Sequence, residues 1–268
     1  MTVARRFARD HRRSFLWWAV GMAAVVAFTA ALWPSVRGQQ QFEELVRDLP
    51  EALRALFGSG EGIAFTSAPG YLHSRLFSTL FPLLVMVFGI GLGARAIGGS
   101  EEDGSLELVA AHPVTRARLA AERYLAMVVL VAGLTVAGLA ALLVVGPAVG
   151  LLDGVGVGRV LVAGVALLGL GLLSSSLAFA AGAAFGRRGV AVAVASTFSV
   201  AGYLLQSLIA ATDVFDAARF VSPWHWYLDR NLLAQSPTVA ALAVPYILAG
   251  AVAVVGGWRF LHRDLKIP

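Results

Sequence analysis

The chemistry that this sequence offers is concentrated in one charged segment, which runs from Ser100 to Arg116. It opens with three consecutive carboxylates, Glu101–Asp103, and Ser100 before them can cap a helix whose first turn favours negative charge. Pro113 would force that helix to stop. The segment is therefore suited to recognising a partner by its charge: a short capped helix could dock on a soluble protein. A solvated connecting loop is the alternative.

The rest of the segment fits the same interpretation. Leu106, Val109 and Ala110 form a short apolar face at helical spacing. Thr115 can cap a following helix that carries Arg116 into the next apolar stretch. The spacing thus predicts a charged helix held between two membrane spans.

Several kinds of catalytic site are missing from the sequence. It has no G-x-x-x-x-G-K-[ST] phosphate loop, no G-x-S-x-G, no cysteine and no pair of histidines at metal-ligand spacing. Gly89, Gly91 and Ala94 match G-x-G-x-x-A, but they lie within an apolar stretch and follow no strand, so helix packing explains them better. We expect a protein that is not an enzyme and binds no metal or cofactor of its own.

The elements that position the charged segment are membrane helices. The chain is 58% hydrophobic and only 14% charged, too apolar for a soluble core of 268 residues. We predict an all-α membrane protein with a single transmembrane domain over residues 1–268. A span needs about 20 apolar residues, and six stretches qualify: 15–33, 76–95, 122–147, 160–185, 190–211 and 239–258.

The basic residues predict the orientation of the bundle. The termini and the loops on their side carry about twice as many Arg and Lys residues as the other loops, which places both termini in the cytoplasm. The net charge of +5 therefore indicates membrane topology and not nucleic-acid binding. Val3–Arg13 is either a short amphipathic helix on the inner leaflet or a set of topology charges. Two short amphipathic helices are expected in the first outer loop, around Pro50. The aromatic run Trp224–Tyr227 is typical of a membrane boundary.

Polar residues inside the spans are few. No ionisable side chain lies deep in the six stretches, which disfavours an ion-coupled carrier. Ser175, Thr197 and Gln206 could line a substrate path, but hydroxyls in membrane helices commonly bond to their own backbone. A face of small residues spaced by four is expected to serve close helix contact and dimerisation: Ser174, Ala178, Gly182 and Gly186.

The charged segment resembles the signature of ABC type-2 permeases, in which two glutamates precede Gly, Ser/Thr, Leu, Glu, Leu and then Pro, Val/Ile, Ser/Thr, Arg. The tail from Phe260 to Leu265 and the Ser222-Pro223 run also resemble that family. The positions that match the signature are Glu101, Glu102, Gly104, Ser105, Leu106, Glu107, Leu108, Pro113, Val114, Thr115 and Arg116.

The resemblance implies a coupling helix that contacts a separate P-loop ATP-binding subunit, which would hold ATP and Mg. It also implies a second permease copy or a homologous permease. We therefore expect the permease subunit of an ABC exporter in a prokaryotic plasma membrane, in contact with lipid and moving an amphipathic or hydrophobic substrate such as a drug, antibiotic or lipid. The alternatives are a membrane scaffold or sensor that transports nothing, and an ion-coupled secondary transporter.

Overall fold

The structure is a computed structural model that describes residues 3–37, 67–105, 115–211, 222–228, 232–233 and 238–263. These residues are almost entirely helical and include no strand. Six helices are long and apolar enough to cross a membrane. Five of the six predicted stretches lie inside one of these spans, and the stretch 190–211 runs two residues past the end of its span at Ile209. We number them as spans 1 to 6: Val3–Val36, Ala68–Glu102, Arg116–Val149, Val157–Phe185, Arg188–Ile209 and Val239–His262.

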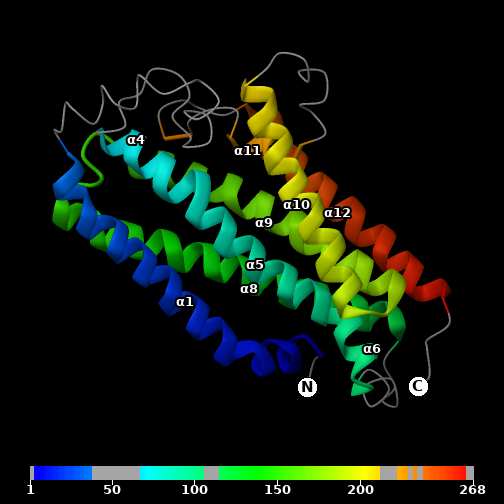
Figure 1. The fold of residues 1–268 in the computed structure, drawn as a ribbon. Helices are drawn as coiled ribbons and strands as arrows, with labels where there is room; N and C mark the ends of the chain where they lie inside the picture. The colour runs from blue at the N-terminus through cyan, green and yellow to red at the C-terminus, as the bar shows by residue number, and fades with distance from the viewer. Residues whose placement is uncertain are drawn as a thin grey trace.

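Two of the spans are composite (Figure 1). Span 2 contains two π-helical segments, η1 and η2, one on each side of α5, and span 3 ends in a short 3-10 turn, η3. The elements are α1 (Val3–Val36), α4 (Ala68–Leu72), η1 (His73–Leu80), α5 (Phe81–Ala94), η2 (Arg95–Gly99), α6 (Ser100–Glu102), α8 (Arg116–Val145), η3 (Pro147–Val149), α9 (Val157–Phe185), α10 (Arg188–Ala211), α11 (His225–Leu228) and α12 (Val239–His262).

Local sequence signals set several helix ends. The side chains of Ser67, Thr115 and Thr238 accept hydrogen bonds from backbone N–H groups in the first turns of α4, α8 and α12. The predicted cap at Thr115 is thereby confirmed. Gly186 ends α9 with φ +67, a left-handed conformation that glycine adopts without strain.

Spans 2 and 4 form the centre of the bundle. They are the two most buried spans, and α9 contacts α5, α8, α10 and α12, whereas α1 packs mainly on α8. The outer helices α1, α8, α10 and α12 expose large apolar side chains such as Trp17, Val129, Val200 and Val254. Apolar exposure on this scale fits a lipid environment.

The contact between α5 and α9 depends on glycine. A Cβ at Gly89 would lie 2.1 Å from Ser175 Oγ, and one at Gly93 would lie 2.3 Å from Ser175 O. At Gly93 the two backbones therefore approach too closely for a larger residue, and at Gly89 the Ser175 side chain fills the space, as in other small-residue membrane contacts. At Gly91, between them, a Cβ would meet nothing within 4 Å. Helix packing thus explains Gly89 and Gly93, but not Gly91.

The predicted small-residue face lies inside the protomer, which corrects its assignment to a dimer interface. Ser174 and Ala178 are buried, and Gly182 contacts Gly98 of η2, whose own Cβ would lie 3.0 Å from Gly182 Cα. Small residues are needed here because span 4 packs against span 2 of the same chain. Gly186 is also covered, by Glu101.

The aromatic run before the last span is also more buried than expected for a membrane-boundary belt. Trp224 and Tyr227 are 6% and 2% exposed. The Trp224 indole donates to Ser199 O at 2.9 Å, and the Tyr227 hydroxyl donates to Phe77 O of η1 at 2.6 Å. The side chains of these two residues therefore pack inside the bundle, where their polar groups find backbone acceptors.

The start of α1 and the end of α12 lie at the same end of the bundle as α6 (Figure 1), here called the α6 end. The segment Val3–Arg13 is the first part of α1 and not a separate helix. Within this segment Phe7 is buried and the arginines are exposed. The amphipathic helices predicted around Pro50 lie outside the described residues.

Candidate coupling site

The helix of span 2 continues through the predicted start of the coupling helix. Ser100 does not cap a new helix, because its hydroxyl donates to Arg95 O and α6 extends η2. Glu101 and Glu102 therefore lie in the last turn of span 2, where the helix dipole opposes negative charge. The predicted first turn was wrong, and both carboxylates need other partners.

Gly104 ends this helix. Its φ of +73 is in the left-handed region, and a Cβ there would meet nothing within 4 Å. The glycine thus serves the turn and not a close approach to another element. Just beside it, hydrogen bonds from Ser105 to Asp103 lower the pKa of the Asp103 carboxyl.

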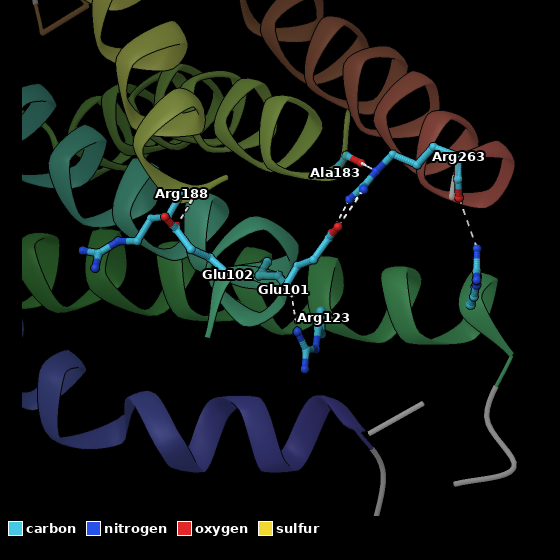
Figure 2. Close-up of polar contacts among 8 residues, drawn as sticks. Glu101, Glu102, Arg123, Ala183, Arg188 and Arg263 are labelled. Atoms are coloured by element: carbon cyan, nitrogen blue, oxygen red, sulfur yellow. Dashed lines mark hydrogen bonds and ion pairs between the residues drawn. The ribbon is translucent and has the colours of Figure 1, made fainter. Parts of the chain in front are cut away.

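Glu101 is paired with an arginine from the other end of the chain (Figure 2). The Arg263 guanidinium donates to both carboxylate oxygens, at 2.7 Å from Nη1 and by a second, shorter bond from Nη2. Its Nε donates to Ala183 O of α9 at 2.6 Å. The side chains of Glu101 and Arg263 are only 5% and 17% exposed. A bidentate arginine–carboxylate pair of this kind is among the stronger ion pairs in proteins.

Glu102 binds the next helix instead. Its Oε2 accepts the backbone N–H of Arg188 at 3.0 Å, at the first residue of α10 (Figure 2). A carboxylate at this helix start is favoured by the helix dipole. Together with Glu101, which contacts Gly186, Glu102 holds the turn between α9 and α10 from two sides.

A second arginine fixes η2. Arg123 of α8 is 6% exposed, and its Nη1 donates to Ala96 O at 2.6 Å. A π-helical segment departs from the regular α-helical bonding pattern and often marks a functional region. Here the carbonyl of Ala96 is bonded to span 3, so the last part of span 2 contacts spans 3, 4, 5 and 6.

The segment between spans 2 and 3 returns to the same place. Arg116, the first residue of α8, donates from Nη1 to the carbonyl oxygen of Arg263 at 3.3 Å. Arg263 is therefore bonded to Glu101 before the segment 103–115, which we call the coupling loop, and to Arg116 directly after it. Five predicted contact residues of this loop lie outside the described residues: Leu106, Glu107, Leu108, Pro113 and Val114.

The three residues of the predicted substrate path lie in different environments. Ser175 is fully buried and donates to Gly171 O of its own helix at 2.6 Å, the backbone role that was its alternative. Thr197 is exposed on α10. Gln206 is half-buried, with its Oε1 unbonded. The structure does not group them into one site.

Sequence reasoning missed the roles of Arg123 and Arg263 because it counted both as topology charges. The tail from Phe260 to Leu265 carried a signal, since its resemblance to the permease ending includes Arg263.

His73, one turn before the predicted start of span 2, lies within the helix and is buried. The described residues hold no group of three His, Cys, Asp or Glu that could bind a metal ion.

Among the described residues, this arrangement joins the ends of neighbouring helices. The residues on either side of the coupling loop are bonded to the ends of spans 3 to 6. The sequence matches, over residues 1–265, the family model described as ABC-2 family transporter protein. No curated protein matches the chain.

Proposed function

Because this chain belongs to the ABC-2 transporter family, and is therefore a multi-pass membrane component of an ABC transporter, we propose that it is the permease subunit of an exporter driven by a separate ATP-binding chain. The α6 end would face the cytoplasm of a prokaryotic cell, as the arginine distribution suggests. Two permease copies, identical or homologous, would form the path.

The observation that carries the proposal is the attachment of the coupling loop. Its entry, at Glu101 and Glu102, is bonded to span 6 and to the start of span 5, and its exit, at Arg116, is bonded to Arg263. A loop attached in this way can pass the movement of an ATPase pair to the membrane helices. A solvated connector would need no such attachments.

An amphipathic or hydrophobic substrate suits this chain best. The interior of the described bundle is mostly apolar with scattered hydroxyls, and the outer helices expose large apolar side chains. Such a molecule could enter from the inner leaflet and leave toward the outer side. The energy would come from ATP and Mg on the partner subunit, since the sequence has no phosphate loop.

The test is co-purification of the chain with a P-loop ATPase, followed by ATP-dependent efflux of a fluorescent amphipathic dye from cells. We expect Glu107→Lys and Gly104→Val to reduce efflux while the protein still inserts in the membrane. Loss of one partner of a buried charged contact costs about 2–5 kcal/mol, and Val at a left-handed φ is strained.

Two outcomes would contradict the proposal. If no ATPase co-purifies and efflux does not depend on ATP, the chain acts as a scaffold or sensor. If efflux follows a proton or sodium gradient in the absence of ATP, the chain is an ion-coupled carrier, for which buried His73 would then be the first residue to examine.

A further inference from the structure

We propose that Arg263 is the positioning residue of the coupling loop: it fixes the entry of the loop through its side chain and the exit through its backbone carbonyl. This inference rests on the proposed function, because it assigns the loop to contact with an ATPase. It differs from the sequence prediction, which placed Glu101 itself at that contact.

The geometry of the entry supports a fixed position. The Arg263 guanidinium binds both oxygens of Glu101 and the carbonyl of Ala183, so three acceptors from spans 2 and 4 share one planar group. Five N–H donors in a rigid fork make arginine suited to this, and lysine cannot reproduce the geometry. The side chain also lies near buried Phe260, with its Cζ 5.8 Å from the ring centroid.

The position of Arg263 in the chain explains how it reaches these partners. It is the first residue after α12, and its extended backbone (φ −100, ψ 152) leaves the helix there. The side chain turns toward α9 and α6, while the carbonyl accepts the bond from Arg116 (Figure 2). The end of span 6 thus sets where the coupling loop begins and ends.

The different burial of Glu101 and Glu102 indicates different roles for the two residues. Glu101 is enclosed by Arg263 and the α9–α10 turn, and a soluble subunit could not bind its carboxylate without breaking the pair. Glu102 and Arg116 are exposed. The glutamate pair therefore has two roles: Glu101 anchors the loop inside the chain, and Glu102, although bonded to the Arg188 N–H, is exposed where a partner can reach it.

The experiment uses the full chain, which has no native cysteine. Ser105→Cys carries a nitroxide at the loop entry, and its mobility is measured by electron paramagnetic resonance in detergent without any ATPase. We expect Arg263→Gln to raise the population of mobile label at least about tenfold, as loss of a buried pair predicts. Arg263→Lys should give an intermediate effect. Arg259→Gln is the matched control, because Arg259 is an exposed arginine in the last turn of α12.

A double-mutant cycle separates the pair from general damage. Glu101→Gln removes the charge that Arg263→Gln would leave unpaired, so the double variant should be less mobile than the sum of the two single effects predicts. Equal mobility in Arg263→Gln and Arg259→Gln would overturn the inference. If Arg263→Gln cannot be purified, unchanged mobility in Arg263→Lys decides against it in the same way.

The second arm adds the ATP-binding subunit. In the wild-type complex, ATP should change the spectrum of the label at position 105, and Arg263→Gln should abolish that change while the ATPase still co-purifies. A spectral change that persists in Arg263→Gln would overturn the positioning role. If the mobility results hold but no ATPase binds the wild-type chain, the proposed function fails and the anchoring of the loop stands.

Discussion

Replacing Gly93 by alanine tests the contact between spans 2 and 4 with a single methyl group. The new Cβ would lie 2.3 Å from Ser175 O and 3.0 Å from Phe179 N, both backbone atoms of α9. Ordinary contact begins at 3.4 Å, so α5 and α9 must move apart by about 1 Å. The matched control is Gly91→Ala, two residues away on the same helix, where a Cβ meets nothing within 4 Å.

The magnitude follows from the geometry. A gap of about 1 Å forfeits a quarter to a half of the dispersion energy of each atom pair that loses contact. Overpacking of this kind typically costs about 1–3 kcal/mol. Alanine in place of a helical glycine contributes up to about 1 kcal/mol in the favourable direction. We therefore expect Gly93→Ala to be destabilised by about 1–3 kcal/mol and Gly91→Ala to equal or exceed the wild-type stability.

The assay is unfolding of purified protein in one detergent, by heat or by titration with sodium dodecyl sulfate, with the wild type and both variants measured side by side. The useful quantity is the difference between the two variants, because detergent effects cancel in it. Equal stability of Gly93→Ala and Gly91→Ala would refute the close approach of α5 and α9.

Three further predictions follow from other parts of the chain. The purified chain alone should hydrolyse no ATP, because it has no phosphate loop; hydrolysis that survives removal of contaminating ATPases would contradict this. Tyr227→Phe should lower stability by about 1–3 kcal/mol in the same unfolding assay, because Phe77 O would lose its donor; no change would mean that water replaces the hydroxyl. Reporter fusions at five sites should alternate between the outer and inner sides, starting outside: Gly38, Asp103, Asp153, Arg188 and Asp229. An inner reading at the first site would reverse the topology.

The helices of the bundle could be predicted because their signal is local. Each span is a continuous apolar run, and lipid imposes a length that such runs must reach. Thr115 also followed from local rules, since a threonine before a helical pattern caps it. The order and type of these elements therefore needed no knowledge of the partners that each helix meets in the bundle.

The end of span 2 shows where local rules fail. Ser100 followed by three carboxylates resembles a helix start, yet the helix continues to Glu102. Its unfavourable charges are stabilised by Arg263, 162 positions away in the sequence, and by the backbone N–H of Arg188. No rule based on neighbouring residues could anticipate partners at that distance.

The charges at membrane boundaries carry more information than orientation alone. Arg123 and Arg263 both contribute to the arginine asymmetry, but each is also bonded to the end of span 2. A charge needed only for topology could move by a turn without loss, whereas these two cannot, because Ala96 O and Glu101 occupy fixed positions. Arg259 is exposed in the last turn of α12, and its position is not subject to that constraint. Arg259→Gln and Arg263→Gln each remove one positive charge from the same end of the bundle, so the two variants should keep the same topology. Only Arg263→Gln should release the coupling loop, which distinguishes a positioning residue from a topology signal.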